Sequence, residues 1–186
     1  MAISIALAPG SLIGCSALRG GDPEPTISAD QAIERVDSVL DDTFKAVHPQ
    51  LKWRDGPAHL SEIKSSFTNT ASGEVSVGRH RFVRTKISKA KLNKLIAAFD
   101  KQWRKAGFEI KSTNPREPSL SGKASDGCVV NFSVSGFGNV EISAGVAARS
   151  DGPRGGIEGE GGDTFPKAPD GGPDYTPDAQ DPYWSA

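Results

Sequence analysis

Apolar residues recur at helical spacing in two segments of the chain. In the first segment the apolar positions are Ile33, Val36, Leu40, Phe44 and Val47. Their spacing of three and four residues predicts an amphipathic helix. Ser28 and Gln31 form a capping-box pair at its start, and His48-Pro49 ends it because a residue before proline avoids the helical conformation.

The second segment has the same period. Its apolar positions are Leu92, Leu95, Ile96, Phe99 and Trp103. Ser88 precedes them as the expected N-cap, and Gly107 follows them where a left-handed C-cap belongs. We therefore expect a second helix between these two residues.

Alternation of apolar and polar residues predicts the strands. The alternating segments are 60–68, 74–87, 108–112, 120–124, 128–135 and 140–147. Residues 49–58 are predicted to form a loop. Within 74–87, the phase set by Val75 and Val77 slips before His80 and Phe82, so we expect a β-bulge at Gly78.

The order of these elements is helix, two strands, helix, four strands. It predicts an α+β domain over 28–149, with an antiparallel sheet of five to six strands and both helices packed on one face. Residues 16–27 are rich in Gly, Pro and charge and are expected to form a flexible tether. Residues 150–186 lack periodicity, so we expect a tail that is disordered or laid over the domain surface.

The amino terminus predicts a lipid anchor. Residues 1–14 are apolar and uncharged, and they give way to polar residues at Cys15. Leu12, Ile13, Gly14 and Cys15 resemble the bacterial lipobox, which implies removal of residues 1–14 and acylation of Cys15. No Lys or Arg precedes the apolar run, so a longer precursor is expected. The alternative is a buried strand over 2–8 with an incidental cysteine.

Charge is unevenly distributed along a chain whose net charge is only −1. Residues 79–105 hold ten Lys or Arg against Asp100 alone, whereas 151–186 hold eight acids and two bases. The second helix thus has a basic face opposite its apolar one. The candidate residues for binding an anionic surface are Arg84, Lys91, Lys94, Lys101, Arg104 and Lys105.

This basic face has two interpretations. It is a solvated surface, or it binds an anionic lipid, a wall polymer, an envelope protein or the acidic tail itself. Nucleic acid is not expected as a partner, because an anchored domain would lie outside the cell and the overall charge is balanced.

The chain contains none of the common catalytic or phosphate-binding motifs. His48 and His59 flank a loop with Asp55, but their spacing matches no metal-binding pattern. His80 is expected on an exposed basic face between two arginines, and Cys128 as a small buried residue. We therefore predict no catalytic residue, no metal ion and no cofactor.

The chain resembles small lipoproteins of actinobacteria, including the LppA-like group, in its lipobox, an amphipathic helix, a hairpin and a second helix that ends in the segment 103–110 (WRKAGFEI). The Asp-Pro-Tyr-Trp segment at 181–184 resembles streptomycete lipoproteins. The resemblance implies a domain on the outer face of the cytoplasmic membrane and brings no catalytic residues. We expect a non-catalytic binding or assembly module at the cell envelope. The alternative is an enzyme or enzyme inhibitor acting on wall or secreted targets.

Overall fold

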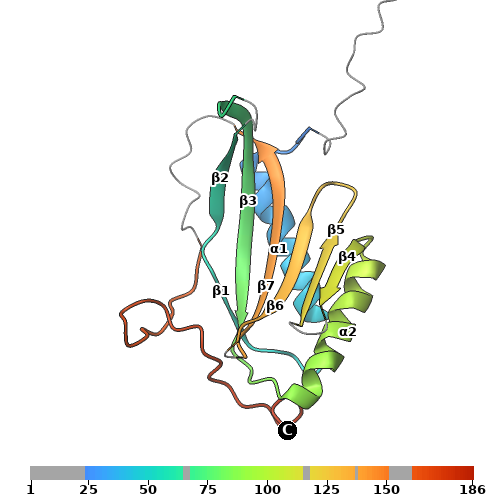
Figure 1. The fold of residues 1–186 in the computed structure, drawn as a ribbon, viewed down its shortest axis with the longest axis vertical. Coiled ribbons are helices and arrows are strands. Elements are labelled where there is room, and N and C mark those ends of the chain that lie inside the picture. Colours follow the sequence, from blue (N-terminus) through green and yellow to red (C-terminus); the bar gives the residue numbers. More distant parts are fainter. Residues whose placement is uncertain (1–23, 65–67, 115–117, 137, 151–160) are drawn as a thin grey trace, which may run out of the picture.

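The computed structural model describes residues 24–64, 68–114, 118–136, 138–150 and 161–186. They form two helices and an antiparallel sheet (Figure 1). The elements are α1 (Ala29–Lys45), β1 (Trp53–Asp55), β2 (His59–Lys64), β3 (Ala71–Val83), α2 (Lys89–Lys105), β4 (Glu109–Asn114), β5 (Ser119–Lys123), β6 (Val129–Val134) and β7 (Val140–Arg149). The predicted α+β class is confirmed.

The sheet has seven strands in the order β1-β3-β7-β6-β5-β4, and β2 also pairs with β3. Because β3 is 13 residues long, β1 and β2 share one edge of it: Trp53 lies opposite Val83, and His59 lies opposite Gly78. The seventh strand is β1, which occupies part of the segment predicted as a loop. Three residues are too few to show an alternating pattern, so the neighbouring edge of β3 defines this strand.

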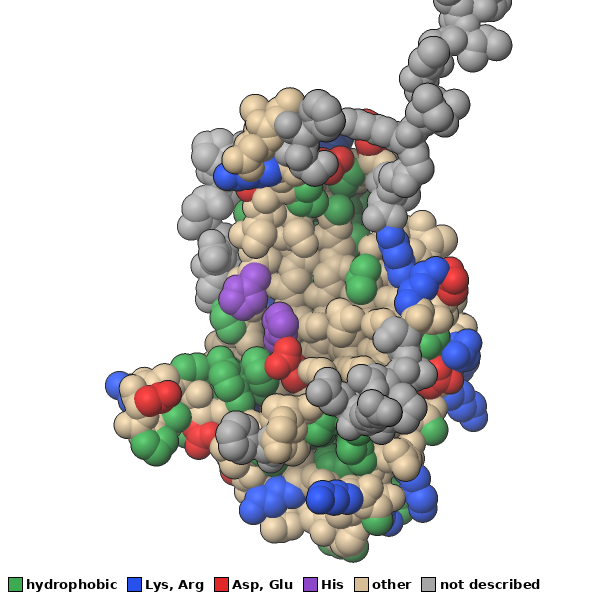
Figure 2. Space-filling view, viewed as in Figure 1, with side chains coloured by type: hydrophobic (Ala, Val, Ile, Leu, Met, Phe, Trp, Pro, Cys, Tyr) green, Lys and Arg blue, Asp and Glu red, His purple; other side chains and the backbone are tan. Residues whose placement is uncertain are grey.

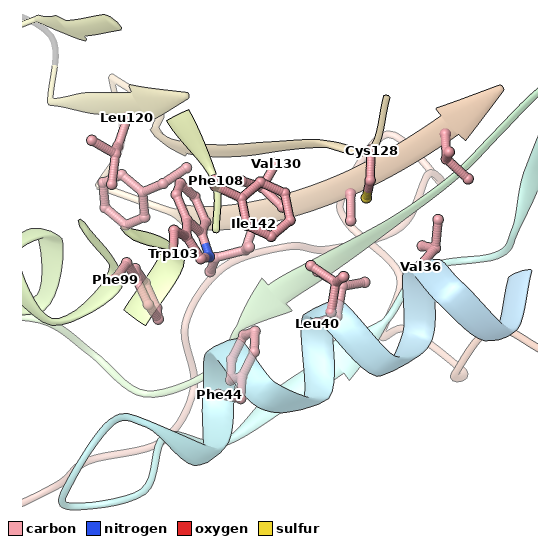
Figure 3. Close-up of a cluster of buried hydrophobic side chains, with 14 of the residues drawn as sticks. Val36, Leu40, Phe44, Phe99, Trp103, Phe108, Leu120, Cys128, Val130 and Ile142 are labelled. Carbon is pink, nitrogen blue, oxygen red and sulfur yellow. The ribbon is translucent and has the colours of Figure 1, made fainter. Parts of the chain in front are cut away.

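Both helices cover the same face of the sheet, as predicted. The α1 helix lies across β3 and β7, and α2 lies across β4 and β5. Apolar side chains of the two helices meet the inward side chains of the strands in one core (Figure 3). Between the helices, the Trp103 indole Nε1 donates a hydrogen bond of 2.9 Å to the buried Thr43 hydroxyl.

The helix ends follow local chemistry with one exception. Ser28 and Gln31 form the predicted capping box, and Gly107 adopts the left-handed conformation with a φ of +87°. Ser88 is the N-cap residue of α2, but its hydroxyl does not cap that helix. It donates instead to the backbone oxygen of Ala186 over 2.7 Å.

The predicted bulge at Gly78 is wrong. The pairing of β3 with β7 is continuous through Gly78, which lies opposite Gly145. The apparent slip arises because Arg79 and Arg81 continue the buried phase of Val77 and Val83. Two charged residues on the helix-covered face hide the true alternation of this strand.

Residues 161–186 run along the β1 edge toward the start of α2 (Figure 1). The backbone of Ala179 bridges to Thr85, and the Trp184 side chain is 2% exposed within the core. The expectation of a disordered tail is therefore wrong for these residues, and its alternative, a segment laid over the domain, describes them. In the described part of the chain, neither helix is long and apolar enough to cross a bilayer.

Candidate functional site

The second face of the sheet carries no helix in the described chain. Since side chains alternate along a strand, β3 and β7 present small or polar residues and Phe82 on this open face, while their other apolar residues enter the core. Figure 2 shows this face, with histidine side chains in purple beside a hollow floored by backbone and small side chains. We call it the open sheet face.

The strand register aligns polar side chains across the open sheet face. His80 of β3 lies opposite Ser143 of β7, which lies opposite Asn131 of β6. Directly opposed residues have Cβ atoms about 4.5–5.5 Å apart. An imidazole, a hydroxyl and an amide thus form one row, although they come from three strands that are distant in sequence.

The hollow on this face has a volume of about 290 Å³. Its lining residues are Ser76, Gly78, His80, Gly127, Val129, Asn131, Ser143, Ala144, Gly145, Val146 and Ala147. Gly78 and Gly145 lie opposite each other and keep its floor flat. A Cβ atom at Gly78 would lie only 3.3 Å from the Ala144 carbonyl oxygen, so the close approach of the strands also favours glycine there.

His80 and Glu141 form an ion pair or hydrogen bond at the border of the hollow. The Nδ1 atom of His80 contacts Oε1 of Glu141, and both side chains remain partly exposed, at 42% and 34%. The His59 ring lies edge-on to His80 with centroids 5.9 Å apart. Because Glu141 engages Nδ1, the Nε2 atom of His80 is the ring nitrogen that can serve a ligand.

An aromatic cluster adjoins His80 on the same face. The Phe82 ring stacks near His80 with centroids 6.3 Å apart, and Tyr175 stacks on Phe82 at 4.1 Å. Phe165 packs edge-on against Phe82 at 5.4 Å. Tyr175 is 39% exposed and is the large apolar residue most open to solvent among those described. Residues 161–186 therefore contribute a wall to the open sheet face.

The basic residues predicted to bind an anionic surface do not form a continuous patch. Arg84 binds Asp178 through two hydrogen bonds of 2.8 and 3.0 Å, and this contact lowers the pKa of Asp178 to about 2. Lys91 and Lys94 lie over the Tyr183 ring, at 3.7 and 5.9 Å from its centroid. The segment that carries the acidic charge thus occupies one end of the basic face.

At the other end of α2, Arg104 pairs with Asp100 within the helix at 2.9 Å. Lys101 and Lys105 are exposed. The hypothesis that the acidic tail lies against the basic residues is supported, for residues 161–186, at Arg84, Lys91 and Lys94. The described residues give it no support at Lys101, Arg104 and Lys105, near the end of α2.

Arg79 and Arg81 do not contribute to any basic surface. Arg79 pairs with Asp37 of α1 at 2.8 Å, and Arg81 pairs with Asp41 of α1 at 2.8 Å and Asp55 of β1 at 2.5 Å. Burial raises the pKa of Asp37, against the opposing effect of the two arginines. The two arginines that flank His80 in the sequence therefore lie on the opposite face of the sheet, so the expectation that His80 belongs to an exposed basic face is wrong.

The structure does not bring His48, His59 and Asp55 together. Asp55 binds Arg81, and His59 faces His80 across the open sheet face. Within the described ranges, no three histidine, cysteine or acidic side chains are arranged to hold a metal ion.

Cys128 is fully buried, as predicted from the alternation of β6. Burial raises the pKa of its thiol to about 11, so the thiol is protonated at neutral pH and has little nucleophilic character. Cys15 and the lipobox residues Leu12, Ile13 and Gly14 lie outside the described residues.

Sequence motifs did not identify Glu141, Asn131 or Ser143 as site residues. The alternation in 141–147 (EISAGVA) did contain a signal, because every second residue is polar or small and must face away from the core. The pairing of β7 with β3 and β6 then determines which other residues join them. No protein-family model matches this chain, and no curated protein sequence matches it either.

Proposed function

We propose that this protein is a lipid-anchored, non-catalytic binding module at the outer face of the cytoplasmic membrane. Its anchor is Cys15, and its binding surface is the open sheet face. The observation that carries the proposal is the hollow beside His80 and Glu141, which is concave and polar and is covered by neither of the two described helices. Ligand sites are typically concave surfaces with a few convergent polar groups.

The candidate basic residues, Arg84 and those of α2, support the proposal less well. Arg84 and Arg104 already pair with carboxylates, and a further anionic ligand would have to compete with Asp178 and Asp100. Exposed lysines such as Lys101 are solvated on most proteins and contribute little by themselves. We retain anionic lipid or a wall polymer as secondary contacts of these basic residues.

The alternative function, an enzyme acting on wall or secreted targets, is favoured by one contact. A carboxylate that holds Nδ1 of a histidine orients the ring as a general base, as Glu141 does for His80. This alternative predicts that a bound ligand is chemically altered and that Glu141→Gln prevents the alteration. A binding module leaves its ligand unchanged.

The anchor is tested by fractionating cells that express the full chain or its Cys15→Ser variant. We expect the wild-type protein in the membrane fraction and the variant in the soluble extracytoplasmic fraction, because two or three acyl chains make attachment effectively permanent. Mass spectrometry of the wild type should find an acylated Cys15 as the first residue. Equal membrane retention of the two proteins would contradict the anchor.

The binding surface is tested with photoreactive benzoyl-phenylalanine at Ser76, which lines the hollow, or at Lys101 on the outer face of α2. On illumination of intact cells, we expect a discrete adduct from position 76 and none from position 101. Both positions are solvent-exposed, so the pair controls for nonspecific labelling. Adducts from position 101 alone would assign binding to the basic helix.

A further inference from the structure

We propose that the hollow of the open sheet face binds an uncharged glycan, a chain of neutral sugar units. This inference rests on the proposed function, because it names the ligand class of the same surface. It follows from three properties of the open sheet face: the charge of the hollow, its hydrogen-bonding groups and the aromatic cluster that adjoins it at His80.

The charge of the hollow matches a neutral ligand. None of its described lining residues is Lys, Arg, Asp or Glu. Arg79 and Arg81 belong to β3, the strand that carries His80, but their side chains point into the helix-covered face. The nearby carboxylate of Glu141 is engaged by His80. A phosphate, sulfate or carboxylate ligand would lose its hydration here, and His80, the one described lining residue that can carry a positive charge, already contacts Glu141.

The hydrogen-bonding groups match hydroxyls. Asn131 offers both a donor and an acceptor, and the hydroxyls of Ser76 and Ser143 can each donate and accept. Nε2 of His80 adds one more polar atom. Sugar hydroxyls also donate and accept, so a row of such groups across three strands can bind successive hydroxyls of one chain.

The flat floor of the hollow and the aromatic cluster beside His80 match the shape of a sugar ring. Gly78 and Gly145 leave a floor without side chains, so a ring can approach the sheet closely. Tyr175 stacks on Phe82 and retains an exposed ring, which can pack against the apolar C–H face of a sugar. An exposed tyrosine held in place by Phe82 and Phe165 loses little conformational freedom on binding.

The inference is tested by applying the full chain in detergent to a glycan array that pairs neutral oligosaccharides with their sulfated or uronic-acid counterparts. We expect binding to neutral members and weaker or no binding to the charged counterparts. For the best neutral ligand, Tyr175→Ala and Asn131→Ala should each raise Kd about tenfold, a change of about 1.4 kcal/mol. Lys101→Ala is the matched control and should leave Kd unchanged.

The thermal unfolding midpoint of each variant shows whether it is folded. Because Asn131 is exposed, we expect Asn131→Ala to keep the wild-type fold. Binding to charged glycans alone, or to none on the array, would overturn the glycan inference. The proposed function is tested separately by photo-crosslinking, and it would be rejected if benzoyl-phenylalanine at position 76 gave no adduct in cells. An adduct at position 76 with no glycan binding would therefore retain the binding surface and reject the glycan.

Discussion

Replacing Trp184 with alanine is expected to lower the free energy of unfolding by about 3–5 kcal/mol, the usual cost of removing a buried tryptophan side chain. Trp184 is 2% exposed and belongs to the main hydrophobic core. Its indole Nε1 donates to the Pro49 carbonyl oxygen over 2.7 Å, and its own carbonyl accepts from the Ser88 backbone N–H over 2.8 Å. The substitution removes the packing of the indole ring and leaves the Pro49 carbonyl oxygen without its hydrogen-bond donor.

Urea denaturation of the two proteins, followed by circular dichroism, measures this difference. Lys167→Ala is the matched control, because Lys167 lies in the same segment but is exposed, and surface substitutions usually change stability by less than about 0.5 kcal/mol. If Trp184→Ala were no more destabilising than Lys167→Ala, residues 161–186 would be a dispensable cover and not part of the core.

Replacing Arg81 with alanine is expected to destabilise the fold by about 3 kcal/mol, the lower end of the range for breaking a buried ion pair. Arg81 is 5% exposed and contacts Asp41 and Asp55. Its guanidinium also lies 5.5 and 5.3 Å from the ring centroids of Phe44 and Trp53. The lower end applies because Asp41 is about half exposed and regains water when the arginine is lost.

Thermal and urea unfolding of Arg81→Ala, Arg81→Met and Arg104→Ala separate the contribution of charge to stability from that of packing. Arg81→Met keeps most of the packing against the aromatic rings and lacks the charge, so it isolates the electrostatic part. Arg104→Ala removes an exposed pair within α2 and is expected to leave stability unchanged. A stability of Arg81→Met equal to that of wild type would mean that the charges at this position contribute nothing net.

Local sequence determined the parts of this protein that depend on neighbours within a few residues. The capping box of Ser28 and Gln31, the left-handed Gly107 and the period of apolar residues suffice to define both helices. Alternation likewise indicated the inward direction of Cys128 and most of the strands. These features follow from backbone geometry and side-chain period, which need no knowledge of distant contacts.

Long-range pairing decided which polar residues became structural and which became a candidate site. Arg79 and Arg81 enter the interior only because Asp37, Asp41 and Asp55 approach from α1 and β1. Composition alone would place these two arginines outside, since an unpaired buried charge is costly.

The open sheet face depends on tertiary structure in the same way. His80 meets Glu141 only because β3 pairs with β7, the last strand among the described residues. Alternation predicts which side of a strand is polar, but it does not predict which strands become neighbours. Likewise, the polar composition of 150–186 suggested disorder, whereas Trp184 packs in the core beside Pro49, 135 residues earlier in the sequence.

The sequence by itself determined the elements and the directions of their faces. Only the tertiary structure determined the charged interior, the docked segment and the hollow, because each needs groups that are far apart along the chain.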